Sequence, residues 1–162
     1  MHLLGSVLFC AGTTIVLKII FLACGHAWGS SIESPSAHAS MSAAVYGALA
    51  IMTLRPGARW KRILLVGAAA ILIGGIAISR LALRVHSVQE IILGLVLGTT
   101  ACAIFAWRYC RLDTSRRIAR PLLFGGSVIL LAALFGIGVA YEDFAYDIAL
   151  TTRTTLHLCP AP

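Results

Sequence analysis

The sequence predicts an all-α fold: a polytopic membrane helical bundle of about five transmembrane helices, forming a single domain over residues 1–162. Hydrophobic residues make up 59% of the chain and charged residues only 12%, against roughly 25% charged in an average soluble domain. The mean hydropathy is +0.93. Apolar runs close to the ~20 residues that cross a bilayer recur along the chain. This composition argues against a soluble globule and excludes a disordered chain, which would be poor in apolar residues.

The expected spans are Leu3–Cys24, Ser36–Leu54, Ile63–Ile78, Ser87–Trp107 and Pro121–Ala140. The third run is short and is expected to continue into Ser79 and Arg80. The fifth opens with a proline, which is favourable at a helix start. The first run lacks a preceding basic segment and carries Lys18, so it fits a cleaved signal peptide poorly. The motif-bearing region is expected at 18–107, followed by the extra span and a polar tail at 141–162.

Basic residues predict the orientation. Most of the 13 Lys and Arg residues fall between spans two and three or between spans four and five: Arg55, Arg59, Lys61, Arg62, Arg108, Arg111, Arg116, Arg117 and Arg120. Both loops share one side of a five-span protein, which the positive-inside rule makes cytoplasmic. The N-terminus is then cytoplasmic and the tail outside. The net charge of +7 is thereby explained without a nucleic-acid partner.

The five cysteines show no CxxC spacing and no obvious pairing. We interpret them as small packing residues, and we expect neither a metal nor a cofactor.

Several polar residues remain, and they gather at the outer side. Lys18 lies within the first span, where a charge costs about 2.5–3.5 kcal/mol and therefore marks a functional candidate; the alternative is snorkelling to the interface. His26, His38 and His86 fall in or beside two outer loops. For each histidine taken alone, the alternative is an ordinary hydrogen-bonded side chain. Two loops converging on one membrane face are what a site between helices would look like.

The spacing of these residues is specific. The third span leads into the pattern Ser79-Arg80-x5-His86-x3-Glu90. On a helix, residues four apart share a face, so Glu90 can contact His86 and fix its tautomer. The segment Pro35-Ser36-Ala37-His38 opens the second span. Its first backbone N–H groups form an anion site, and together with Arg80 and Lys18 they would bind a phosphate.

These residues resemble the PAP2 (type 2 phosphatidic acid phosphatase) superfamily of integral-membrane lipid phosphatases. The family has three motifs in order: Lys-x6-Arg-Pro, Pro-Ser-Gly-His and Ser-Arg-x5-His-x3-Asp. Lys18 opens a degraded first motif. The second and third motifs correspond to 35–38 and 79–90. Three departures stand out: Glu90 replaces Asp, Ala37 replaces Gly, and Gly25-His26 replace Arg-Pro.

The resemblance implies a metal-independent phosphoryl transfer through a phosphohistidine. His86 would attack phosphorus, Glu90 would orient it, and His38 would protonate the leaving oxygen and then help to activate water. The phosphate would be held by Lys18, Ser36, Ala37, Ser79 and Arg80. Arg84, one turn from Arg80 if the helix continues, or His26 would replace the missing guanidinium.

We therefore expect a hydrolase acting on a lipid phosphate or lipid pyrophosphate at the periplasmic face of a bacterial inner membrane, with the phosphorylated lipid and membrane lipids as partners. Whether the chain forms a homo-oligomer stays open, as does the identity of the lipid. The main alternative is a catalytically degenerate PAP2-like protein that binds or transports phosphorylated lipids. A b-type haem protein using the three histidines, and a purely structural membrane protein, are further alternatives.

Overall fold

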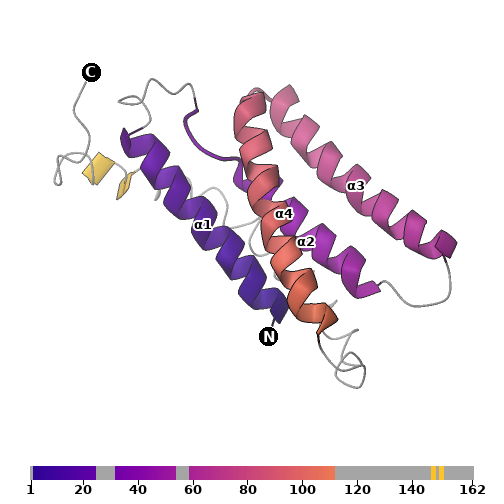
Figure 1. The fold of residues 1–162 in the computed structure, drawn as a ribbon. Coiled ribbons are helices and arrows are strands. Elements are labelled where there is room, and N and C mark those ends of the chain that lie inside the picture. The colour runs from indigo at the N-terminus through magenta and orange to yellow at the C-terminus, as the bar shows by residue number, and fades with distance from the viewer. Residues whose placement is uncertain (1, 25–31, 54–58, 112–146, 149, 152–162) are drawn as a thin grey trace. The chain divides into compact units, whose positions relative to one another are not determined.

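The computed structural model describes residues 2–24, 32–53, 59–111, 147–148 and 150–151. Within this part of the chain lie four α-helices (Figure 1): α1 (His2–Cys24), α2 (Ala37–Thr53), α3 (Arg59–Ala82) and α4 (Val88–Cys110). The all-α class is confirmed. The expected fifth span at 121–140 lies outside the described residues.

Three of these helices are long and apolar enough to cross a membrane: Leu3–Cys24 of α1, all of α3 and all of α4. At 1.5 Å per residue the 23 residues of α4 extend about 35 Å, slightly more than a bilayer core. The apolar part of α2, Ala37–Met52, is shorter.

Two helices extend beyond their predicted ends. The expected third span began at Ile63, but α3 begins at Arg59 and ends at Ala82. The expected fourth span ended at Trp107, but α4 continues to Cys110. A span read from hydropathy stops at the first charge, whereas Lys and Arg are good helix formers whose long side chains can reach an interface. Arg59, Lys61 and Arg62 thus belong to the start of a helix rather than to a loop.

The chain divides into two compact units, one comprising 1–14 and 35–111 and the other 15–34 and 112–162. The first unit contains the beginning of α1 and all of α2, α3 and α4. The expectation of a single domain over 1–162 stays a prediction.

Small residues let α2 and α4 approach closely within the first unit. A Cβ placed on Gly94 would lie 2.5 Å from the carbonyl oxygen of Ser36, and one on Gly98 would clash with the carbonyl oxygen of Ser40. Glycine is therefore required at both positions by packing. This use of two glycines four residues apart is common between membrane helices. The backbone at the start of α2 is consequently held directly against α4.

The first half of α1 is attached to α2 by packing and by hydrogen bonds. Leu3 packs on a buried cluster of Ala48, Met52 and Phe105. Further along, the hydroxyls of Thr14 and Ser40 are hydrogen-bonded at 3.1 Å, and both side chains are buried. A polar contact in an apolar interior sets the register of the two helices, because sliding either helix would leave buried hydroxyls without this partner.

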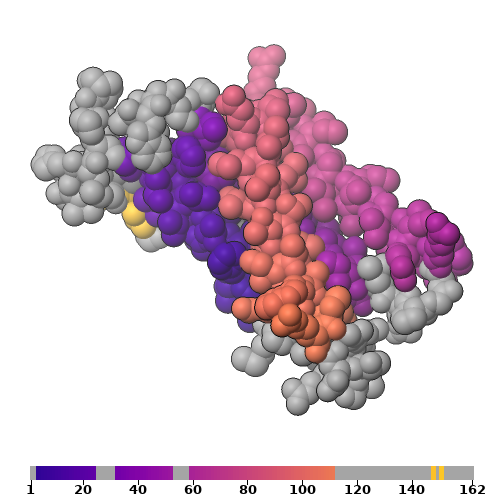
Figure 2. All heavy atoms as spheres, viewed as in Figure 1, coloured from indigo at the N-terminus to yellow at the C-terminus, as the bar shows by residue number. Residues whose placement is uncertain are grey.

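In contrast, α3 presents most of its apolar surface outwards. Ala77 is its one buried residue, and Ile63, Leu64 and Ile71 are 64%, 63% and 76% exposed. Figure 2 shows the outer surface of α3 uncovered on the face in view. Such a surface is unfavourable in water and favourable against lipid.

The cysteines differ from the expectation in one respect. Cys10, Cys102 and Cys110 are free, as predicted, and Cys10 is buried against Ala44 and Ala101. Cys24, at the end of α1, is disulfide-bonded. The prediction that all five are unpaired packing residues was therefore wrong for Cys24, because disulfide connectivity cannot be deduced from sequence spacing alone.

Candidate active site

The site begins where α3 ends. The backbone N–H of Val85 donates to the carbonyl of Arg80 at 3.3 Å, and that of Arg84 donates to Leu81 at 3.0 Å. Arg84 has φ 54° and is the one non-glycine residue with positive φ in the described chain. These features form a Schellman motif, in which a left-handed residue terminates a helix and satisfies its last carbonyls. Arg80 is thereby placed in the last turn of α3.

Two residues further on, α4 begins with a capping box. The hydroxyl of the N-cap Ser87 accepts the N–H of Glu90 at 3.4 Å, and the Glu90 carboxylate accepts the N–H of Ser87 at 2.8 Å. The same carboxylate oxygen, Oε2, lies 3.2 Å from Nδ1 of His86. The side chains of His86 and Glu90 are only 9% and 7% exposed. A largely buried carboxylate therefore contacts one imidazole nitrogen, as the sequence spacing predicted.

The predicted spacing between Arg80, His86 and Glu90 now has a physical basis. The Schellman motif comprises the six residues from Arg80 to Val85, and His86 follows directly. Ser87 must then come next as the N-cap, and the third helical residue, Glu90, is the one whose side chain reaches back to it. Only His86 lies between the end of the Schellman motif at Val85 and the N-cap Ser87. The sequence separations of Arg80, His86 and Glu90 are therefore set by the end of one helix and the start of the next.

The start of α2 lies against the start of α4. The N–H of Ser36 donates to the carbonyl of Glu90 at 3.1 Å, which joins the two motif-bearing segments directly. The Ser36 hydroxyl accepts the N–H of Ala39 at 3.4 Å and so acts as the N-cap of α2. Ser36 is fully buried. A hydroxyl that accepts this bond can still donate its proton, for example to a phosphate oxygen.

One apolar cluster holds all three helix ends together. Ala39, Ala77 and Ile91 form a buried cluster, with Leu95 packed against it. Ala39 follows His38 in sequence, Ile91 follows Glu90, and Ala77 lies just under one turn before Arg80. The residues that carry the second and third motifs are therefore positioned by a single packing contact among α2, α3 and α4.

The remaining candidate residues occupy different environments. His38 is half-buried in the first turn of α2, and Ser79 is half-buried in the last turn of α3, where its hydroxyl donates to the carbonyl of Ile76 at 2.7 Å. Lys18 is buried on α1, in the other unit of the chain. Ala37 is the first residue of α2 and does not have positive φ, so the absence of glycine there causes no backbone strain. His26 lies outside the described residues.

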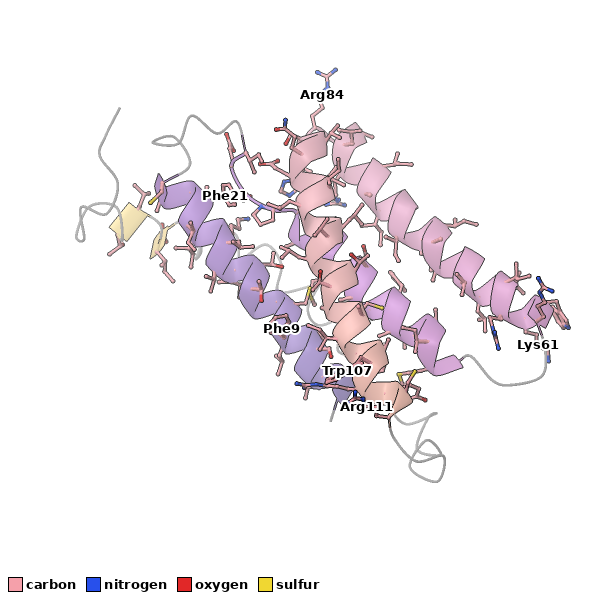
Figure 3. The ribbon with its side chains drawn as sticks, viewed as in Figure 1. Phe9, Phe21, Lys61, Arg84, Trp107 and Arg111 are labelled. Carbon is pink, nitrogen blue, oxygen red and sulfur yellow. The ribbon has the colours of Figure 1, made fainter. Side chains whose placement is uncertain are left out.

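Arg84 differs from the sequence expectation. We expected it one turn from Arg80 along a helix, but α3 ends at Ala82 and Arg84 is the left-handed residue after that end. Its side chain is exposed and extends away from the helices (Figure 3). Lys61, Trp107 and Arg111 lie at the opposite end of these helices. There the Arg111 guanidinium lies 4.1 Å from the centre of the Trp107 ring.

Sequence reasoning missed two contributors to the site. Ser87 was treated as the start of a span rather than as a functional residue, although Ser followed three residues later by Glu is the capping-box pattern. Gly94 lies opposite Ser36, a contact between residues far apart in the sequence that no local pattern predicts. Among the described residues, no group of three or more His, Cys, Asp or Glu side chains is arranged to hold a metal ion.

The fold and the long apolar helices define a helical membrane protein, with polar residues gathered where α2 begins, α3 ends and α4 begins. The chain belongs to the PAP2 superfamily, whose family model matches residues 1–115. This match covers the described parts of α1, α2, α3 and α4 and confirms the resemblance found in the sequence motifs. Searches of curated proteins and of solved structures each gave no match.

Proposed function

We propose that this protein is a membrane lipid phosphate or lipid pyrophosphate phosphatase that works through a phosphohistidine without a metal. The observation that carries the proposal is the 3.1 Å hydrogen bond from Ser36 N to Glu90 O, which holds the second and third motif segments together. Membership of a family that consists generally of phosphatases supports the reaction class.

The nucleophile in this proposal is His86. Its Nδ1 lies against the Glu90 carboxylate at 3.2 Å, so the proton resides on Nδ1 and Nε2 carries the lone pair that attacks phosphorus. The carboxylate also stabilises the positive charge that the ring acquires on forming the N–P bond. As that bond forms, the bond from phosphorus to the lipid oxygen breaks.

The second histidine completes the cycle. His38, in the first turn of α2, gives a proton to the departing lipid oxygen and then takes one from the water that attacks the phosphohistidine. This second attack breaks the N–P bond and releases inorganic phosphate. Both steps need the two histidines on opposite sides of one phosphorus atom.

The phosphate oxygens would be bound by cations and by backbone donors. Arg80 supplies a planar guanidinium suited to two oxygens at once, and Lys18 supplies a second positive charge. Ser36 and the N–H groups at the start of α2 complete the set, and Ser79 would join them once its hydroxyl turns away from the carbonyl of Ile76. His26 would supply the charge that the degraded first motif lacks, because the Arg84 side chain extends away from the helices.

The proposed orientation puts this site at the outer face of the membrane. Arg59, Lys61 and Arg62 at the start of α3, with Arg108 near the end of α4, lie at the far end of these helices, which the positive-inside rule makes cytoplasmic. The disulfide at Cys24 supports this, because disulfides persist in oxidising compartments and the end of α1 would face outwards. The protein would then serve a bacterial inner membrane, with the headgroup in the site and the tail in lipid.

The test is phosphate release by the purified protein in detergent with EDTA present. The panel contains phosphatidic acid, phosphatidylglycerol phosphate, a polyprenyl pyrophosphate and a lipid A phosphate. Wild type should release phosphate from at least one, and His86→Ala should reduce the rate about a thousandfold or more. His2→Ala is the matched control, because His2 begins α1, and Leu3 beside it packs with Phe105 and Tyr109 near the far end of α4.

Two results would contradict the proposal. Release that disappears with EDTA and returns with a divalent cation would replace the phosphohistidine route by a metal-dependent one. Tight binding of a phosphorylated lipid, without phosphate release by folded protein, would favour the degenerate binding protein instead.

A further inference from the structure

One oxygen atom of the site serves two donors. Glu90 Oε2 accepts the backbone N–H of Ser87 at 2.8 Å and lies 3.2 Å from Nδ1 of His86. In the second half of the capping box, the Ser87 hydroxyl accepts the backbone N–H of Glu90 at 3.4 Å. The backbone N–H of Ser87 therefore holds the carboxylate that contacts His86, and the hydroxyl of Ser87 holds the backbone of Glu90.

This arrangement restricts where the carboxylate can go. A glutamate side chain has three rotatable bonds and would sample several positions if His86 were its one partner. The bond to Ser87 N–H selects the rotamer that points back towards the start of α4. In that rotamer Oε2 is already placed beside Nδ1 before any substrate arrives.

We propose that Ser87 is a positioning residue for the phosphohistidine reaction: its hydroxyl caps the first turn of α4 and so keeps the Ser87 N–H on the Glu90 carboxylate, which selects the tautomer of His86 with the proton on Nδ1. The inference rests on the proposed function, and it assigns to Ser87 no contact with substrate. The role of Ser87 is exerted through Glu90 alone.

The same arrangement accounts for the glutamate at position 90. A carboxylate at the third position of a helix reaches the N-cap N–H in the capping box when it is carried by Glu. Aspartate is one methylene shorter, so its carboxylate oxygen could not reach Ser87 N and His86 Nδ1 at the same time. A longer side chain shared between these two donors makes the replacement of Asp by Glu compatible with the histidine contact.

The experiment compares Ser87→Ala and Ser87→Gly with wild type, using Thr100→Ala as the matched control. Thr100 is also on α4, and its hydroxyl bonds to the carbonyl of Val96 within the same helix. Glycine is included because it is tolerated at an N-cap and so removes the hydroxyl with little cost to folding. Ser87→Thr retains an N-cap hydroxyl and should rescue the function.

Two quantities are measured for each variant. The first is kcat and KM for the lipid that wild type hydrolyses, where Ser87→Ala and Ser87→Gly should lower kcat about tenfold and leave KM within about twofold. The second is the tautomer ratio of His86, measured by NMR of 15N-labelled histidine against a His86→Ala reference. Wild type, Ser87→Thr and Thr100→Ala should show predominantly the Nδ1–H form, and the two Ser87 variants a mixture.

A second pair of variants separates capping from charge. Glu90→Gln can still accept the Ser87 N–H but has no charge for His86, whereas Glu90→Asp keeps the charge but is shorter. Adding Ser87→Ala to Glu90→Gln should cost little more than Glu90→Gln alone, because Ser87 acts through the carboxylate. Full additivity of the two losses would overturn the inference.

The inference also fails if Ser87→Ala matches Thr100→Ala in both kcat and tautomer ratio while wild type is active; the proposed function would then stand. If wild type releases no phosphate from any lipid, the proposed function fails, and the tautomer ratio still decides whether Ser87 positions the pair. An unchanged ratio in folded Ser87→Gly overturns the inference in either case.

Discussion

Replacing Gly94 with alanine should separate the start of α2 from α4 and damage the site. The new Cβ would lie 2.5 Å from the carbonyl oxygen of Ser36. Ordinary carbon–oxygen contacts between helices are about 3.3–3.6 Å, so the two backbones must separate by about 1 Å. The bond from Ser36 N to Glu90 O would lengthen from 3.1 Å to about 4 Å, beyond hydrogen-bonding range.

The magnitudes follow from these displacements. Overpacking costs about 1–3 kcal/mol and the lost hydrogen bond about 1 kcal/mol, while alanine regains about 1 kcal/mol of helix propensity over glycine. The expected net loss of stability is about 1–3 kcal/mol. A shift of about 1 Å between catalytic groups can lower the rate about a hundredfold, so the loss in kcat/KM should exceed what instability alone explains.

The assay is thermal unfolding in detergent together with phosphate release, and Gly74→Ala is the control. Gly74 lies in α3, where an added Cβ would meet nothing within 4 Å. Its replacement should be neutral or stabilise by up to about 1 kcal/mol. If Gly94→Ala were as stable and as active as Gly74→Ala, the close approach of the two helices would not be what builds the site.

Three further predictions concern stability. Thr14→Val should lower the free energy of unfolding by about 1 kcal/mol, because it removes the buried bond to Ser40; a double-mutant cycle with Ser40→Ala should show coupling, and independent losses would contradict the assigned register. Arg84→Gly should raise the melting temperature, because φ 54° costs a non-glycine residue about 1 kcal/mol; a lower melting temperature would mean that the guanidinium stabilises the fold. Phe105→Ala should cost about 3–5 kcal/mol in chemical denaturation, since the ring is 1% exposed, and a near-neutral result would exclude its place in the core.

Much of the fold was predictable because hydropathy and helix length are local properties. Four predicted spans correspond to α1, α2, α3 and α4, with differences confined to their ends. The ends of α3 and α4 were misplaced where basic residues continue a helix past its apolar run. The Schellman motif at Arg84 was not predictable from composition, since the left-handed position that glycine usually occupies is here an arginine.

The candidate site was predictable to the extent that its parts lie close in sequence. The contact between His86 and Glu90 follows from their separation of four residues, and the structure contains it at 3.2 Å. The roles assigned to Lys18, Arg80 and His38 stay predictions, because they depend on which side chains meet a phosphate. The position of Ser87 as an N-cap was predictable from the pattern of Ser followed three residues later by Glu, but that pattern does not by itself connect Ser87 with His86.

The sequence by itself determined the membrane class, the family motifs and the local pairing of histidine with glutamate. These depend on composition and on spacing within one helix turn, where covalent geometry leaves few alternatives. Only the tertiary structure decided that Ser36 donates to the carbonyl of Glu90, and that Ala39, Ala77 and Ile91 bring three helix ends to one place. Contacts between residues on different helices depend on which helix faces meet, and here the absence of a side chain at Gly94 lets α2 and α4 meet closely enough to form the site.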